Sequence, residues 1–497
     1  MSRPDPLDEI ALLVRSKHGL VVLETEDEER AETLLRHLAD RLGVPLFVWT
    51  RSRGLRRDDA QGPVYGTQQP AAALAHVEHA AFPAVYHFHG LAPFLEDPAV
   101  AAALADAARP YETTGGLLVL TGGEVHLPDR VRPRAATVRL AAPGDEDYHQ
   151  LLGHILRDLR KRQDVTVEMD ADGLRRLYAN LRGLTLLEAE KVLTRAMVED
   201  GRLAPDDIAA VLEHKRRVVE REGVLEYYPA EEAMADIADL ASLKAWLAKR
   251  ASMITDPQRA REFGLEFPKG ILLVGVPGAG KSLCAKAVAT EWTLPLLKLD
   301  PSSLYNKYIG ETEKNFRRAM EIAERMAPVV LWIDELEKAF AQAGGSEDGG
   351  VSTRVLGTFL SWMQDRRGDV FIVATANDVT RLPPEFLRKG RFDEIFFVDL
   401  PDEETRAAIF RIHLARRNQQ PEAFDLAALA AASTGFTGAE IEQVVISGLY
   451  SAFTGEGRLD QATLVDEIGR TRPLSRMAAE RISALRHWAE GRTVPAN

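Results

Sequence analysis

The chain of 497 residues is long enough for about three or four domains or subdomains, because single hydrophobic cores stop growing at roughly 250 to 300 residues. Its formal net charge of −13 argues against nonspecific binding to nucleic acid or anionic lipid, which needs clustered Lys and Arg. Cys284 is the only cysteine, so no intrachain disulfide can form, and we expect a reducing, cytoplasmic setting. No signal segment and no run of about 18 apolar residues is evident, so we expect no membrane span.

The stretch from Gly19 to Leu46, GLVVLETEDEERAETLLRHLADRLGVPL, predicts a strand, a polar turn and an amphipathic helix. A phosphate-binding strand, loop and helix follow one another in the same order, but this turn holds no glycine. Carboxylates beside a triphosphate would repel it by about 1 kcal/mol or more for each close pair at a protein surface. The turn carries five of them: Glu24, Glu26, Asp27, Glu28 and Glu29.

The sharpest signal lies between Gly270 and Ala289, in GILLVGVPGAGKSLCAKAVA. A predicted strand runs into the eight-residue pattern G-x-x-x-x-G-K-S and then into a helix. The glycines let the backbone bend sharply and bring its N–H groups to phosphate, Lys281 adds charge at the outer phosphates, and Ser282 can hold Mg²⁺. The residues expected to bind nucleotide here are Gly275, Pro277, Gly278, Ala279, Gly280, Lys281, Ser282 and Leu283.

A buried apolar strand, PVVLWI, is followed by Asp334 and Glu335. In a parallel sheet, ligands gather at the carboxyl ends of the strands, so these acids are expected beside the phosphate loop. Asp334 would join Ser282 in supporting Mg²⁺, through water, and Glu335 would orient and polarise the attacking water. The alternative is an ordinary strand exit that caps a helix.

The next apolar strand ends at Asn377, whose amide can hold the attacking water or the terminal phosphate. Arg388 and Arg391 follow in LRKGRFD, too far along to be obvious partners of their own site. A plain strand cap for Asn377 and surface salt bridges for the arginines are the alternatives. Together with the glycine loop and the two acids, these residues resemble the AAA branch of the AAA+ ATPases, in which such arginines reach the nucleotide of the neighbouring subunit.

The resemblance covers residues 225 to 470 and implies an α/β fold. In this P-loop AAA+ module, a parallel five-stranded sheet with flanking helices is followed by a helical lid. Ile237 and Ala238 stand where the family's entry segment lies near adenine, and Gly438 and Ala439 stand where many lids close over the base. A plain helix start is the alternative for Gly438.

Arginines donated in trans imply a head-to-tail interface, which closes into a ring or runs on as a filament. The family closes as hexamers. The segment KYIGETEKNFR resembles the first pore loop of ring-shaped unfoldases, and it places Lys307, Tyr308, Ile309 and Gly310 in that loop. Tyr308 and Ile309 would grip a threaded polypeptide by packing. A buried Tyr–Ile pair at a helix start is the alternative.

The first half of the chain repeats the second at a separation of about 250 residues. PAVYHFHGLAPFL aligns with PVVLWIDELEKAF, LLVLTGGEVHLP with FIVATANDVTRLP, and GLTLLEAE with GFTGAEIE. His89 and Gly90 take the positions of the two acids, and Gly123 takes that of Asn377. We therefore expect a degenerate AAA-like α/β domain with its own helical lid. An unrelated α/β domain of similar element order is the alternative.

A degenerate half before one complete module resembles the Ycf-type AAA ATPases of plastids, cyanobacteria and other bacteria, as does the C-terminal segment. The expected parts are a degenerate α/β domain, its lid, a linker, a large ATPase subdomain, and a second lid with a C-terminal helix, at 1–144, 145–213, 214–235, 236–401 and 402–497. Four basic residues of the linker are expected on one solvated helix face: Lys215, Arg216, Arg217 and Arg221.

These features predict a Mg²⁺-dependent ATPase that assembles with itself as a hexameric ring and remodels or unfolds a protein substrate through its pore. One alternative is a nucleotide-dependent scaffold or regulator whose first half binds a partner. A nucleic-acid motor or loader is disfavoured by the acidic charge and the AAA-type arginine segment. No HExxH zinc-protease motif occurs, so proteolysis would need a separate partner.

Overall fold

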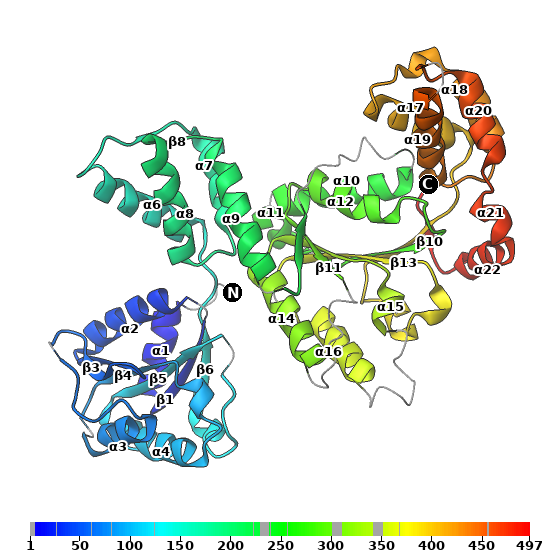
Figure 1. The fold of residues 1–497 in the computed structure, drawn as a ribbon. Coiled ribbons are helices and arrows are strands. Elements are labelled where there is room, and N and C mark those ends of the chain that lie inside the picture. Colours follow the sequence, from blue (N-terminus) through cyan, green and yellow to red (C-terminus); the bar gives the residue numbers. More distant parts are fainter. Residues whose placement is uncertain are drawn as a thin grey trace. The chain divides into compact units, whose positions relative to one another are not determined.

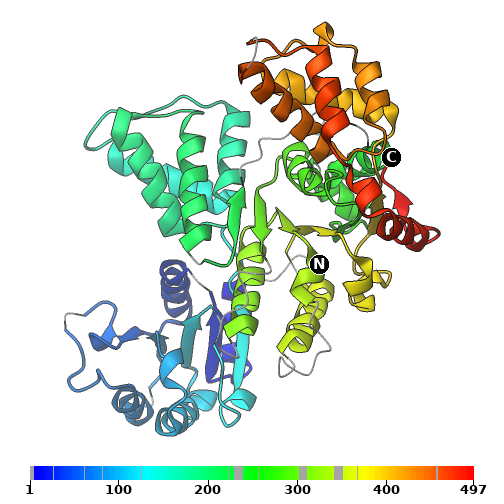
Figure 2. The same cartoon turned by 45° about the vertical axis from the view of Figure 1, so that its right-hand side comes forward.

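The computed structural model describes residues 5–25, 27–60, 62–80, 82–123, 125–221, 223–228, 238, 240–255, 257–300, 311–340, 351–366, 368–454 and 457–497. The chain divides into two units, Met1–Leu212 and Glu213–Asn497, each with its own sheet (Figures 1 and 2). Within the described ranges, every helix is too short or too polar to cross a membrane.

The sheet of the first unit has the strand order β3-β2-β4-β5-β1-β6. All neighbouring strands are parallel except β2 and β3, which form an antiparallel hairpin. Most of the parallel strands are continuous apolar runs, because both faces of the sheet are covered. The strands are β1 (Leu20–Glu24), β2 (Leu46–Thr50), β3 (Gly54–Arg57), β4 (Val85–His89), β5 (Leu117–Gly122) and β6 (Ala135–Arg139).

Helices cover both faces of this sheet (Figure 1). Side chains alternate along β1, so Val21 and Leu23 pack with one helix pair while Leu20 and Val22 pack with the other. The first pair is α1 (Pro6–Arg15) and α2 (Glu28–Leu42), and the second is α3 (Pro70–Ala80) and α4 (Pro98–Ala108). Shorter elements are η1 (Ala92–Phe94), α5 (Tyr111–Thr114) and η2 (Arg132–Arg134).

A small helical subdomain completes the first unit. It comprises α6 (Asp145–Leu159), α7 (Ala171–Leu181) and α8 (Leu186–Asp200), with a short parallel pair, β7 (Thr166–Val167) and β8 (Arg202–Leu203). Helix α9 (Asp207–Arg221) follows and runs across the boundary between the two units.

The second unit has a seven-stranded sheet of order β15-β14-β10-β13-β12-β11-β9. The five parallel strands predicted for this module are present, and two short edge strands extend them: β9 runs antiparallel to β11, and β15 runs parallel to β14. The strands are β9 (Glu226–Tyr228), β10 (Gly270–Gly275), β11 (Leu296–Leu299), β12 (Val329–Ile333), β13 (Val370–Ala376), β14 (Glu394–Val398) and β15 (Val494–Pro495).

This sheet is also covered on both faces (Figure 1). One face packs against α10 (Ala241–Thr255) and α12 (Lys281–Glu291), and the other against α14 (Glu311–Arg325) and α16 (Val351–Asp365). Shorter helices are α11 (Pro257–Glu262), α15 (Leu336–Phe340), η4 (Val379–Arg381) and η5 (Pro384–Leu387).

A helical lid follows the second sheet and has its own apolar core, which includes Phe410, Leu429 and Val444 (Figure 2). Its helices are α17 (Glu403–Arg416), η6 (Pro421–Ala423), α18 (Leu426–Ala432), α19 (Gly438–Thr454) and α20 (Gln461–Arg470). Helices α21 (Leu474–Met477) and α22 (Ala479–Ala489) lead the chain back to the sheet, where Arg486 pairs with Asp399 at 2.9 Å.

The two sheets share one topology. Omitting edge strands, the first reads β2-β4-β5-β1-β6 and the second β11-β12-β13-β10-β14, so strands in the same chain order occupy the same places. A helical lid follows each sheet. The prediction of an AAA-like α/β fold in the first half is therefore confirmed.

The segment 214–235, expected to be a linker, is partly built into the second unit. Val219, Val224 and Leu225 belong to its apolar core, and β9 joins its sheet. Lys215 is only 2% exposed, so it does not share the solvated face expected for it, whereas Arg216 is exposed. Positions four apart lie on one helix face, and Lys215 therefore lies on the side of the buried Val219.

Candidate functional site

The loop from β10 to α12 spans residues 276–280. Gly278 and Gly280 have φ values of +77° and +96°, in the left-handed region that favours glycine. A Cβ at Gly275 would lie 1.9 Å from the carbonyl oxygen of Val398. The N-cap residue of α12 is Gly280, which has no side chain to accept the first-turn N–H groups. Such a helix start suits a phosphate.

Lys281 begins α12 and is only 5% exposed. Its Nζ donates to the carbonyl oxygens of Gly275 at 2.9 Å and Val276 at 2.8 Å. An ammonium group has three N–H donors, so one donor is left for a phosphate oxygen. Burial lowers the pKa of Lys281 to about 8, although nearby carboxylates, Glu337 foremost, act to raise it.

Ser282 and Asp334 are brought together from two elements. The Ser282 hydroxyl donates to Asp334 Oδ1 at 3.1 Å. A hydroxyl and a carboxylate are oxygen ligands of the kind that Mg²⁺ takes, and Mg²⁺ usually completes its shell with water and substrate phosphates. Among the described residues, no group of three or more His, Cys, Asp or Glu side chains could hold a metal ion by itself.

Glu335 and Asn377 also meet at the carboxyl ends of their strands. Asn377 Nδ2 donates to Glu335 Oε1 at 2.9 Å, and Lys338 forms an ion pair with the same carboxylate. Glu335 has φ of +51°, which is unusual for a residue with a side chain.

Two residues of this site were missed in the sequence. Thr375 donates to Asp334 Oδ1 at 2.6 Å and accepts the N–H of Glu335 at 2.9 Å. Glu337, only 3% exposed, accepts the N–H of Asn377 at 2.8 Å, and burial raises the pKa of Glu337. The available signals were a Thr within an apolar strand and a further acid, Glu337, two residues after Glu335.

The lid meets the phosphate loop. The N–H of Ala439 donates to the carbonyl oxygen of Gly278 at 3.2 Å, so Gly438 and Ala439 lie beside the loop. Ala238 is half-buried. Ile237 lies outside the described residues.

The two arginines differ in their surroundings. Arg388 is exposed, and no described residue forms an ion pair with it. Arg391 is half-buried and donates to the carbonyl oxygen of Leu360 in α16. The four residues expected in the pore loop, Lys307, Tyr308, Ile309 and Gly310, lie outside the described residues.

Comparison with known proteins agrees with this geometry. The model of the ATPase family associated with various cellular activities (AAA) matches residues 271–400. Models of the N-terminal and second domains of SpoVK-like AAA ATPases match residues 6–140 and 146–222. The chain is 32% identical to the AAA domain-containing protein ycf46 of Trieres chinensis, over 97% of this chain and 96% of that protein. The chain belongs to the AAA ATPase family.

Two further relatives match a little less than half of this AAA ATPase. The ATP-dependent zinc metalloprotease FtsH 3 of Sphaerobacter thermophilus is 33% identical over 48% of this chain and 50% of that protein. The cell division cycle protein 48 homolog of Archaeoglobus fulgidus is 36% identical over 43% of this chain and 30% of that protein. The resemblance to Ycf-type proteins is confirmed, and ATP hydrolysis follows from the family.

The first half of the AAA ATPase has a different loop at the equivalent place. Only residues 25–27 separate β1 from α2, and Asp27 caps the helix by accepting the N–H of Arg30 at 3.2 Å. The second carboxylate oxygen of Asp27 accepts the N–H of Leu186, at the start of α8, at 3.0 Å. The chain's own carboxylate therefore stands where a phosphate would bind the helix end.

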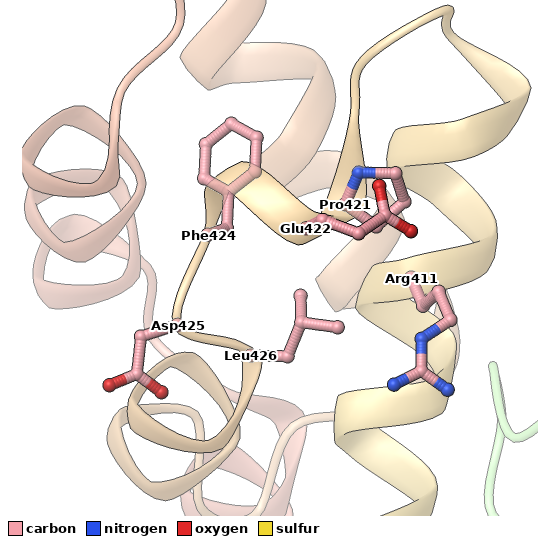
Figure 3. Close-up of a pocket in the computed structure, with 6 residues that line it drawn as sticks. All are labelled: Arg411, Pro421, Glu422, Phe424, Asp425 and Leu426. Atoms are coloured by element: carbon pink, nitrogen blue, oxygen red, sulfur yellow. The ribbon is translucent and has the colours of Figure 1, made fainter.

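An open cavity in the lid lies apart from these residues (Figure 3). Arg411 of α17 lines it, together with Pro421, Glu422, Phe424, Asp425 and Leu426, and Figure 3 shows the Leu426 side chain extending toward that helix. None of the residues expected to bind nucleotide lines it. The phosphate loop and strand ends, not this cavity, form the candidate site.

Proposed function

We propose that this AAA ATPase hydrolyses ATP with Mg²⁺ as a head-to-tail ring, a hexamer, and that it uses the cycle to remodel or unfold a protein substrate. The observation that carries the proposal is the hydrogen-bonded row at the strand ends. It pairs Ser282 with Asp334 and Asn377 with Glu335, and Thr375 connects the two pairs beside a glycine loop that suits phosphate.

At this site the phosphate loop and Lys281 bind the phosphates of ATP through the first-turn amides of α12 and the remaining ammonium donor. Ser282 and Asp334 would hold Mg²⁺, which neutralises charge on the phosphates when bound. Glu335 orients the attacking water and takes its proton, while Asn377 holds the carboxylate of Glu335 at 2.9 Å and responds to the terminal phosphate.

The ring is supported by Arg388. This arginine is exposed, follows the strand ends of its own site, and forms no ion pair with a described residue. It is therefore suited to contact the nucleotide of a neighbouring subunit. An arginine finger supplied in trans increases phosphoryl-transfer rates by about 10³ to 10⁵. Arg391 contributes less directly, since it already donates to Leu360.

A protein substrate is supported by two relatives and by one motif. FtsH 3 is named as an ATP-dependent protease, whose substrates are proteins, and half of its length aligns with this chain. The segment KYIG, at 307–310, matches the aromatic pore loop of unfoldases. The sequence holds no HExxH motif, so proteolysis would need a separate partner.

A mixing experiment tests the ring. Arg388→Ala subunits keep an intact phosphate loop, and Lys281→Ala subunits keep an intact arginine. Each variant alone should turn over at least about 100-fold more slowly than the wild type, whereas a mixture should regain activity, because the site of one receives the arginine of the other. Arg381→Ala, at an exposed arginine of the same segment, should behave as the wild type.

A mixture no more active than the sum of its parts would contradict the trans arrangement. The substrate class is tested by capturing proteins on Glu335→Gln held in ATP and by measuring turnover with unfolded protein, DNA or RNA. Stimulation by unfolded protein that Tyr308→Ala abolishes supports remodelling. Stimulation by nucleic acid favours a motor, and slow turnover insensitive to Tyr308→Ala favours a regulator whose first half binds the partner.

A further inference from the structure

Thr375 lies at the end of β13, beside the end of β12. The register pairs Ile333 with Ala374, so the next residues, Asp334 and Thr375, lie opposite one another. Thr375 is 1% exposed, and its hydroxyl donates to Asp334 Oδ1 at 2.6 Å while it accepts the N–H of Glu335 at 2.9 Å. One hydroxyl group therefore contacts both acids that follow β12.

The contact supports an unusual backbone. Glu335 has φ of +51°, a left-handed conformation that is unfavourable for a residue with a Cβ. The bond from its N–H to Thr375 holds this turn. At the matching place in the first half stands Gly90, with φ of +68°, which needs no such support. There the matching threonine, Thr121, bonds to His87 at 2.9 Å instead.

The hydroxyl also fixes the side chain of Asp334. Asp334 Oδ1 accepts both the Thr375 hydroxyl and the Ser282 hydroxyl, at 2.6 and 3.1 Å. Two donors on one oxygen restrict rotation of the carboxylate. A threonine hydroxyl has one proton, and here that proton is taken by Asp334. Thr375 has no proton left to offer ATP, so it acts through its two neighbours.

We propose that Thr375 is a positioning residue for ATP hydrolysis, which orients the Asp334 carboxylate and the Glu335 backbone without touching the substrate. This inference rests on the roles proposed above for Asp334 and Glu335. A positioning role differs from a purely structural one in its effect on the kinetics. Loss of the hydroxyl should slow the chemical step more than it weakens folding or ATP binding.

The test uses the full-length protein with Thr375→Val, which keeps the shape and removes the hydroxyl. Partners that orient metal ligands typically contribute about 10- to 100-fold in activity or metal affinity, so kcat should fall by about that factor. The KM for ATP should stay within about twofold of the wild type, as for an interaction that acts on the chemical step. The Mg²⁺ concentration for half-maximal turnover should rise. Thr375→Ser should restore kcat to within about threefold.

A matched control is Thr290→Val in α12, where the hydroxyl donates only to Lys286 of the same helix, at 3.2 Å. It should leave kcat and the Mg²⁺ requirement unchanged. If thermal unfolding shows that Thr375→Val does not fold, Thr375→Ala takes its place in the comparison with Thr375→Ser.

Glu335→Gln, assayed in parallel, distinguishes a failure of the role proposed for Glu335 from a failure of the inference on Thr375. Normal turnover by Glu335→Gln would overturn the role proposed for Glu335. An inactive Glu335→Gln beside a folded Thr375→Val with wild-type kcat would overturn the inference on Thr375 alone. A Thr375→Ser variant as slow as Thr375→Val, or a loss confined to KM, would do the same.

Discussion

Asp27 closes the loop of the first unit, and its removal should loosen the attachment of α8. The side chain is 7% exposed and accepts two backbone N–H groups, from Arg30 in α2 and Leu186 in α8. Asp27→Ala removes a helix cap, which contributes about 0.5–2 kcal/mol. It also removes a hydrogen bond to a charged acceptor, which contributes about 1.5–3 kcal/mol when buried. Because Leu186 is only half-buried, we expect a total of about 2 kcal/mol.

Hydrogen–deuterium exchange of the full-length protein measures this effect locally. A loss of about 2 kcal/mol corresponds to about 30-fold faster exchange where opening is local, so peptides that cover residues 184–190 should exchange faster by about that factor. Asp27→Asn should show a smaller change than Asp27→Ala, because its single amide oxygen can still accept one of the two N–H groups, while its NH₂ group cannot accept the other.

The control is Asp97→Ala, which removes an exposed cap of α4 that accepts the N–H of Ala99 at 2.8 Å. It should destabilise α4 by about 1 kcal/mol and leave α8 unchanged. Unchanged exchange at the start of α8 in Asp27→Ala would refute the reasoning, because the bond to Leu186 would then contribute nothing.

Two further predictions follow from the sites. Glu335→Gln should bind one ATP per chain and hydrolyse it at least about 100-fold more slowly than the wild type. The control Glu291→Gln, at the exposed end of α12, should hydrolyse ATP at the normal rate. A second bound ATP per chain would mean that the first half also binds nucleotide. Burial, and then nearby His89, lowers the pKa of His87 to about 3, below the unfolded value of 6.5, so the stability from the neutral ring is complete above pH 6.5 and is lost as the pH falls towards 3. Unfolding in urea should be measured between pH 7 and 4.5, at the transition that Asp27→Ala also shifts. There, His87→Gln should reduce the acid-dependent loss of unfolding free energy by up to about 1.4 kcal/mol per pH unit. An unchanged slope of that free energy against pH would count against this prediction.

The sequence determined the chemistry of the second half. The phosphate loop needs glycines at set spacings and a following Lys and Ser. Because all of these residues lie within eight positions, the loop can be recognised without a structure. The strand ends carrying Asp334 and Asn377 were equally legible, because apolar runs of strand length stop at polar residues. The repeat between the halves was found from the order of such runs, and the two sheets have the same topology.

Only the tertiary structure decided how distant residues support these motifs. Thr375 and Glu337 act across neighbouring strand ends, and Asp27 bonds to a helix 159 residues away. The edge strands β9 and β15 are two or three residues long and are recognisable only by the strand beside them. A hydrogen bond between residues far apart in the chain leaves no periodicity in the sequence, whereas a turn or an amphipathic face does. Local sequence patterns therefore predict which residue types form the candidate site, and the packing of the strands decides which other side chains orient them.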